Sequence, residues 1–297
     1  MSIVFQSFTN TELLSAAGPS QSLIVTKPAG VANGDVMYLV FVSAVTSATS
    51  GVLTADAAVS GFTLVASTIA AASSTIRRMW VFRKAVTNAG AEPADYTVSL
   101  GSANTMDLYA ALVRVSGVNP SVSEDAVGSF SGDITSTTLT FPSVTTANAN
   151  SSLMMIGYGR RGSTTATFND GVEFVDVGNG AVAGMRLYVG YLTQSAAGAS
   201  GAKTAALSAS RENNGIIIAL NEASGVLAIT SITPSQIDSG ESFTITGTGF
   251  GATQGLSLVQ IGGVTQTPTS WSDSSITCTA TRGSQSMGNA TLTVYKM

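Results

Sequence analysis

One short apolar run constrains the fold of this chain more than any other feature. Residues 36–45 read VMYLVFVSAV, in which only Ser43 is not apolar, and a turn-rich lead-in with Pro28, Gly30 and Gly34 precedes them. Ten residues rich in β-branched and aromatic side chains, bounded by turn residues, are typical of a strand covered on both faces. The run is also too short to cross a bilayer, which takes roughly 20 apolar residues. We therefore expect a central strand that much of the chain serves to cover.

Further segments of strand length follow this run, and the sequence shows no long amphipathic helical pattern. Residues 75–86 (TIRRMWVFRKAV) place Trp80 and Phe82 on one face of a strand and Met79 and Val81 on the other. A strand of this kind is also covered on both faces. The remaining predicted strands before residue 120 include 3–8, 23–25, 61–68, 92–100 and 108–115.

Four cations, Arg77, Arg78, Arg83 and Lys84, lie at the two ends of the 75–86 segment. They could form a binding patch. Charges at strand ends also solvate the rim of a sheet and discourage pairing between edges. We expect the second role.

The order of these segments repeats in the chain. Residues 141–159 repeat the turn-then-strand pattern of the opening stretch, 171–178 match 61–68 at an offset of 110, 185–193 match 79–87 at 106, and 216–225 match 108–117 at 108. We interpret residues 1 to about 120 and about 134–224 as two copies of one unit. The copies could form two small sandwiches in tandem, or one larger jelly-roll-like sandwich. Separate small copies would leave sheet edges open, which favours a single shared core.

Composition narrows the possible functions. Charged residues make up 10% of the 297 residues, against about 25% in ordinary soluble proteins. The net charge is -4 and the chain has no basic cluster, which argues against binding nucleic acid. The single cysteine, Cys278, excludes an intrachain disulfide and a zinc site made of thiolates, and we expect it to be a buried strand residue.

The chain contains no histidine, which removes the usual activation of serine and cysteine nucleophiles and the usual proton shuttle near neutral pH. Paired carboxylates could still hydrolyse glycosides. The candidate pairs are Glu124 with Asp125, and Glu173 with Asp176, where the second pair lies on opposite faces of one predicted strand. We interpret all four as solvated carboxylates.

Two further patterns resemble ligand sites. Residues 178–184 (GNGAVAG) resemble a dinucleotide-binding glycine pattern, but they lie between two predicted strands with no helix after them, so we expect a hairpin turn. Asp133, Asp170 and Asp176 could offer oxygen ligands to calcium, but no calcium-binding loop pattern is present. The sequence thus predicts no catalytic residue, no cofactor-binding residue and no metal site, and indicates that the protein is not an enzyme.

The pattern changes near residue 226. The segment 228–251 (AITSITPSQIDSGESFTITGTGFG) and the later segments 259–264, 270–280 and 290–295 resemble the IPT/TIG family of immunoglobulin-like domains. The features that carry this resemblance are Pro234, the turn at Ser239 and Gly240, and the glycine-rich 247–251. The resemblance implies a small β-sandwich over residues 226–297, used as a spacer or for protein contacts, and implies no catalysis.

Residues 1–224 resemble, in pattern, a module of bacterial surface proteins and of virion structural proteins of tailed phages. The matching stretches include PAGVANGDVMYLVF at 28–41, GFTLVAS at 61–67 and EPADYTVSL at 92–100. This resemblance supports a virion setting and assigns no site. The N-terminal segment has no Lys or Arg before Lys27 and no continuous apolar stretch, which does not indicate a secretory signal.

The sequence therefore predicts an all-β protein, with a duplicated jelly-roll-like sandwich over residues 1–224 followed by an Ig-like domain. We expect a tailed-phage virion protein, a capsid decoration or head-fibre component, that attaches through the sandwich and projects the Ig-like domain for weak adhesion. It would assemble in the host cytoplasm, be exposed on the particle, contact other capsid or tail proteins and form homo-oligomers, without binding nucleic acid or inserting into a membrane. The alternative is a tail-tip or surface adhesin that binds host carbohydrate.

Overall fold

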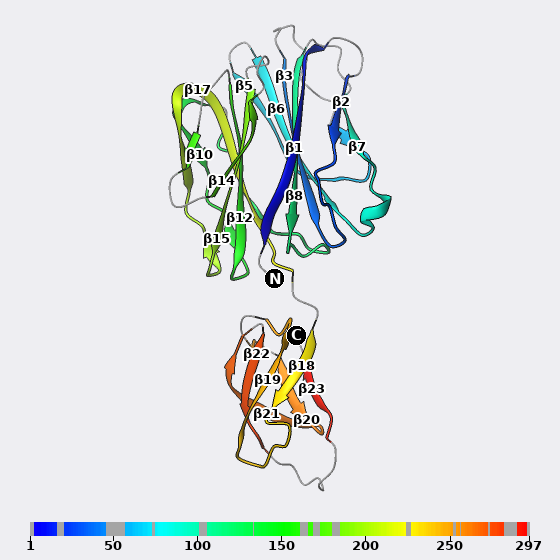
Figure 1. Cartoon of the computed structure of the whole chain (residues 1–297). Coiled ribbons are helices and arrows are strands. Elements are labelled where there is room, and N and C mark those ends of the chain that lie inside the picture. Colours follow the sequence, from blue (N-terminus) through cyan, green and yellow to red (C-terminus); the bar gives the residue numbers. More distant parts are fainter. Residues whose placement is uncertain are drawn as a thin grey trace. The chain divides into compact units, whose positions relative to one another are not determined.

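Among the described residues, the regular secondary structure is almost entirely β-strand (Figure 1). The computed structural model describes residues 3–16, 21–45, 57–72, 75–100, 106–132, 134–160, 166–168, 173–179, 185–223, 227–251, 254–255, 257–272, 274–281 and 290–295. Within these ranges the one helix is a 3-10 turn, η1 (Ala89–Ala91), and none is long and apolar enough to span a membrane. The chain divides into two compact units, Ser2–Ala223 and Ser224–Met297.

The first half of the larger unit is a jelly roll. One antiparallel sheet has the order β1 (Val4–Ala16), β8 (Met106–Ser116), β3 (Val36–Val45), β6 (Thr75–Ala85) and β5 (Thr63–Ala72). A second sheet has the order β2 (Gln21–Thr26), β7 (Asp95–Leu100) and β4 (Ala58–Val59). The chain crosses between the sheets so that the first strand pairs with the eighth and the second with the seventh, which is the jelly-roll connection. The apolar run at 36–45 is the central strand of its sheet, which confirms the prediction.

The second half repeats this strand order. Its larger sheet runs β10 (Ile134–Phe141), β17 (Lys203–Leu220), β12 (Ser151–Arg160), β15 (Met185–Gln194) and β14 (Glu173–Asn179), and a small sheet pairs β11 (Thr145–Thr146) with β16 (Gly198–Ala199). Two short strands, β9 (Glu124–Val127) and β13 (Ala166–Phe168), also pair with β17. Counted from the start of each half, both large sheets have the order first, eighth, third, sixth, fifth. The duplicated sandwich is therefore present.

Three buried layers fill the larger unit. The middle layer, which we call the shared core, joins Tyr38 and Val40 of β3 to Ile156 of β12 and Ile218 of β17. Two outer cores lie within the individual jelly rolls, one around Leu39, Phe41 and Trp80, the other around Phe141, Leu153 and Met155. The structure combines the two arrangements that the sequence leaves open. The expected shared core exists, but each copy also closes into its own sandwich, because strands that are apolar on both faces need cover on both sides.

The two copies correspond strand by strand, but one sequence match has the wrong register. Tyr38 pairs with Arg83 and Val113, whereas Ile156 pairs with Val189 and Ile216. The offset of 106 maps Arg83 onto Val189, the partners of Tyr38 and Ile156. In the same alignment Val113 corresponds to Ile216, an offset of 216 − 113 = 103 instead of the predicted 108. An odd error in register exchanges the two faces of a strand. Strands that are apolar on both faces leave such an error invisible in the sequence.

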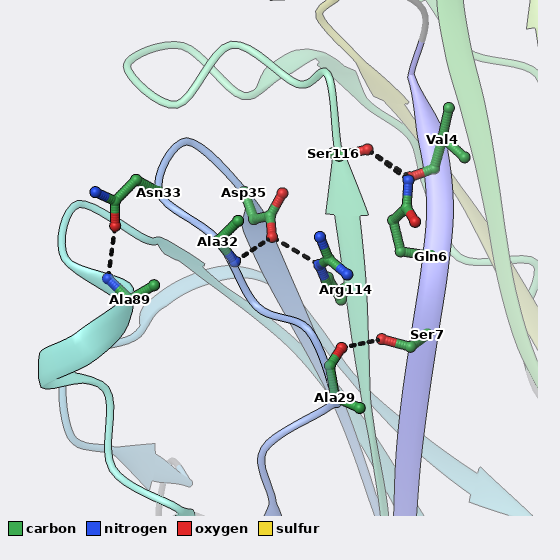
Figure 2. Close-up of polar contacts among 10 residues, drawn as sticks. All are labelled: Val4, Gln6, Ser7, Ala29, Ala32, Asn33, Asp35, Ala89, Arg114 and Ser116. Carbon is green, nitrogen blue, oxygen red and sulfur yellow. Dashed lines mark hydrogen bonds and ion pairs between the residues drawn. The ribbon is translucent and has the colours of Figure 1, made fainter.

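The lead-in to β3 is held by side chains from several elements (Figure 2). Asp35 Oδ2 accepts hydrogen bonds from the backbone N of Ala32 at 2.7 Å and from Arg114 Nε of β8 at 2.6 Å. Asn33 Oδ1 accepts the backbone N of Ala89 at 2.7 Å, which ties the turn to η1. On the other side, Ser7 of β1 donates to the carbonyl of Ala29 at 3.0 Å. These contacts fix the point at which the central strand enters the sheet.

The C-terminal unit is a small sandwich. Its strands have the order β18 (Ala228–Thr233), β19 (Ser242–Thr248), β22 (Ser275–Thr279), β21 (Val264–Trp271), β20 (Leu258–Ile261) and β23 (Leu292–Tyr295). The C-terminal half of β21 pairs with β22 and its N-terminal half with β20, so this strand links the two layers. Phe243, Ile245, Val259 and Cys278 are buried between them. Burial of Cys278 confirms its prediction and raises the pKa of its thiol to about 11.

Candidate functional site

Two of the four cations of β6 connect the two jelly rolls. Arg77 is fully buried, and its Nη2 lies 2.5 Å from Glu212 Oε2 on β17. Arg83, six residues along the same strand, places its Nε 3.3 Å from Glu124 Oε2 on β9. Both arginines have the same parity on β6 as Met79 and Val81, which line the shared core. An ion pair between the copies therefore lies at each end of this core.

The expected rim role of the four cations is wrong for two of them. Arg77 has no exposed surface and Arg78 is only 8% exposed. Arg78 stacks over the ring of Trp80, with its guanidinium carbon 4.8 Å from the ring centroid. The reason is tertiary and differs for the two residues: the second jelly roll covers Arg77, whereas Arg78 points to the opposite face, toward Trp80 in the outer core of the first jelly roll. The sequence of β6 alone shows neither contact.

Lys84 lies in a separate cluster within the first jelly roll. Its Nζ is 2.6 Å from Glu92 Oε2 and 5.2 Å from the ring centroid of Tyr96. The Tyr96 hydroxyl donates to the same carboxylate oxygen at 2.6 Å. Burial of Glu92 acts to raise the pKa of its carboxyl, but the hydrogen bonds from Lys84 and Tyr96 and the charges of Lys84 and Lys27 outweigh it and lower that pKa. Lys84 therefore stabilises the first jelly roll through its ion pair with Glu92.

Glu124 and Asp125 do not act as a pair. Glu124 Oε1 accepts the hydroxyl of Tyr38 at 2.7 Å, and burial together with the charge and hydrogen bond of Glu124 raises the pKa of that hydroxyl well above its usual value. Asp125 instead accepts the Ser151 hydroxyl at 2.7 Å and the side-chain amide of Asn148 at 2.8 Å. Neighbouring strand residues point to opposite faces, so Glu124 contacts the first jelly roll and Asp125 contacts the second. The expectation that they are solvated is wrong, because both are partly buried and hydrogen-bonded.

The other candidate carboxylates are only partly described. Glu173 and Asp176 both lie on β14, opposite Tyr191 and Tyr188 of β15, with no bulge between them. Their side chains, and residues Asp133, Asp170 and 180–184 of the predicted turn and calcium candidates, lie outside the described residues. Among the residues that are described, no group of three or more Asp, Glu, His or Cys side chains could hold a metal ion.

Sequence reasoning overlooked a surface of the C-terminal unit. On β19 and β22, Ser242 pairs with Thr279, Thr244 with Thr277, and Thr246 with Ser275. All six lie on the outward face, because Phe243 and Ile245 between them are buried. The signal was present as alternation of Thr with apolar residues in SFTITGT and SITCT.

The same face continues onto the flanking strands. On β18, Ser231 and Thr233 pair with Thr246 and Thr244, and on β21, Thr267 and Ser270 pair with Thr279 and Thr277. We call these ten residues the hydroxyl face: Ser231, Thr233, Ser242, Thr244, Thr246, Thr267, Ser270, Ser275, Thr277 and Thr279. Every one carries a side-chain hydroxyl, and seven of them are exposed.

Comparison with known protein families identifies the family of the C-terminal unit. Residues 227–296 match the IPT/TIG domain family. The C-terminal unit is an Ig-like IPT/TIG domain. The match confirms the resemblance predicted for this segment, and domains of this family are often involved in adhesion or binding. No curated protein and no solved structure matches the chain, so the phage-like character of residues 1–224 stays a prediction.

Proposed function

We propose that this protein is a structural component of a tailed-phage virion, of the capsid decoration or head-fibre type. Its paired jelly rolls would attach to the particle, and its IPT/TIG domain would contact surfaces outside. The observation that carries this proposal is the jelly-roll strand order occurring twice around one shared core. Jelly rolls recur in viral capsid and lectin domains, and the support is therefore an analogy of fold.

The polar contacts described above also support a scaffold. Arg77, Arg83, Glu124 and Asp125 are each engaged in holding elements of the larger unit together. A unit joined by an apolar layer and two ion pairs suits a protein that must keep its shape on a particle. Its partners would be other virion proteins and further copies of itself. Many copies on one particle would turn a weak contact of each IPT/TIG domain into firm adhesion.

The test is the location and number of copies in purified particles. We expect quantitative mass spectrometry to find the chain in a fixed ratio to the major capsid protein, and whole-particle cryo-electron microscopy to place it at repeating capsid positions. Absence of the chain from purified particles would refute the proposal.

The hydroxyl face favours a second candidate function, a tail-tip or surface adhesin that binds host carbohydrate. An uncharged face rich in hydroxyl groups can exchange hydrogen bonds with sugars. This function predicts a few copies confined to the tail, so the same particle analysis separates the two candidates.

A further inference from the structure

The hydroxyl face presents hydrogen-bonding groups in a regular array. Strands in a sheet lie roughly 4.8 Å apart, and outward residues of one strand follow each other at roughly 6.8 Å. Thr244 Oγ1 and Thr277 Oγ1, on neighbouring strands, are 3.4 Å apart. Each hydroxyl can both donate and accept a hydrogen bond. Because threonine is branched at Cβ, its side chain has little rotational freedom to lose when a ligand binds.

Charge is absent from the strands that carry this face. Residues 227–297 contain five charged side chains, Asp238, Glu241, Asp273, Arg282 and Lys296. None of the five falls within the bounds of the strands described for this unit. A nucleic acid or an acidic polymer would find no array of cations there, and such polymers depend on one for their affinity.

The face also lacks an apolar patch. The exposed large apolar residues described in this unit are Leu227, Ile229 and Tyr295, and none of them belongs to the hydroxyl face. Ile229 pairs with Gly247, which is in the inward row of β19, and Tyr295 lies on β23 at the other end of the sheet order. An apolar peptide or a lipid surface would therefore gain little by covering the hydroxyl face.

We propose that the hydroxyl face binds a neutral polysaccharide. A chain of uncharged sugars matches the face in both respects, because it carries many hydroxyl donors and acceptors and no charge. This inference rests on the adhesive role proposed above for the IPT/TIG domain and names the class of its ligand. Hydrogen bonds exposed to water are individually weak, so the contact gains strength from several domains acting on one polymer.

The test uses the full chain and three insoluble neutral polysaccharides, cellulose, chitin and starch, in co-sedimentation assays. The variant Thr246→Val/Thr279→Val removes two exposed hydroxyls of the face and keeps the branched shape that strands prefer. A matched control, Thr26→Val/Thr97→Val, removes two exposed threonine hydroxyls from the outer face of the β2–β7 pair. Circular dichroism confirms that both variants fold.

We expect wild type to bind at least one of the three polymers, with binding unchanged between about 0.05 and 0.5 M salt because no charges take part. The Thr246→Val/Thr279→Val variant should bind about tenfold more weakly, which corresponds to about 1.4 kcal/mol, and the control should bind as wild type does. Equal binding by both variants, or no retention of wild type by any of the three polymers, would overturn the inference.

Two further outcomes identify other occupants and also contradict the proposal. Binding to heparin alone, lost at high salt, would indicate an acidic ligand. Dimerisation in sedimentation velocity that Thr246→Val/Thr279→Val abolishes, without polysaccharide binding, would indicate a second copy of the chain. If particles carry the protein at repeating positions but no polysaccharide binds, this inference fails while the proposed virion function stands.

Discussion

The two jelly rolls share a strand order but cover their outer cores differently. The first has a three-stranded outer sheet over a core that includes the large side chain of Trp80. The second has an outer sheet of two strands with two residues each, and there Gly157 and Gly215 let β10 pack closely. A Cβ atom on Gly215 would lie 2.6 Å from the carbonyl oxygen of Thr140, and one on Gly157 would lie 2.9 Å from Leu139 Cδ2. The first copy thus fills its outer core with a large side chain, whereas the second fills its outer core by close approach of the backbones.

The copies also differ in the charges that they bring to their contact. Both arginines, Arg77 and Arg83, come from β6 of the first copy, and both glutamates, Glu124 and Glu212, come from strands paired into the second sheet. Two first copies would lack Glu124 and Glu212, the partners of these arginines. The charges therefore favour pairing of the first copy with the second, in addition to the apolar layer that both supply.

The largest expected effect tests how the first outer core is filled. Trp80→Ala should lower the free energy of unfolding by about 4 kcal/mol, because it leaves a large cavity among buried side chains. Trp80→Phe should cost clearly less, since Trp80 Nε1 has no hydrogen-bond partner among the described residues. Urea unfolding of both variants checks this. Equal losses for Ala and Phe would show that the volume of the indole is not what matters.

The next effect tests the contact between the copies. Arg77→Met should cost about 3 kcal/mol, because it leaves Glu212 without its buried partner. In a double-mutant cycle, adding Glu212→Gln to Arg77→Met should recover part of the loss. Thermal unfolding of the four proteins measures the coupling. Additive losses would contradict a direct interaction across the shared core.

The close packing of the second copy predicts a smaller loss. Gly215→Ala should cost about 2 kcal/mol, because the added methyl meets the backbone of Thr140 and the ring of Phe141. Gly90→Ala is the control, since the nearest atom to its new Cβ would be Asn88 Oδ1 at 3.5 Å, and its effect should stay within about 0.5 kcal/mol. Chemical denaturation compares the two, and similar losses would remove the proposed difference between the copies.

The smallest effect concerns pH and the first copy alone. The lowered pKa of Glu92 means that its ionised form is favoured in the folded state. Its contribution is therefore present above the unfolded pKa, about 4.3, and is lost as pH falls through the lower folded value. Glu92→Gln should destabilise the protein slightly at pH 7 and flatten the fall in stability below about pH 4. Thermal melts between pH 7 and 3 check this, and parallel curves for the variant and wild type would refute it.

Sequence reasoning succeeded where local chemistry decides the outcome. The strand at 36–45, the burial of Trp80 and Cys278, and the IPT/TIG domain were all predicted. It failed for the offset of 108, because a strand apolar on both faces gives no sign of which face is which. It also failed for Arg77 and Glu124, since their partners are 135 and 41 positions away along the chain, a separation that no local pattern reports. The hydroxyl face lay between these cases: the alternation was visible, but the alignment of four strands was not.

The sequence by itself determined that the chain forms strands and that it does so in two similar halves followed by a smaller domain. Strand formation depends on the alternation of apolar and polar residues, on β-branched side chains and on turn residues within short segments, and these features can be read from the local sequence. Only the tertiary structure decided that the halves close separately and still share a core, that arginines of β6 are buried against glutamates of the other half, and that ten hydroxyl residues meet on one face. Each of these depends on which strands become neighbours, and that is set by the packing of the whole unit.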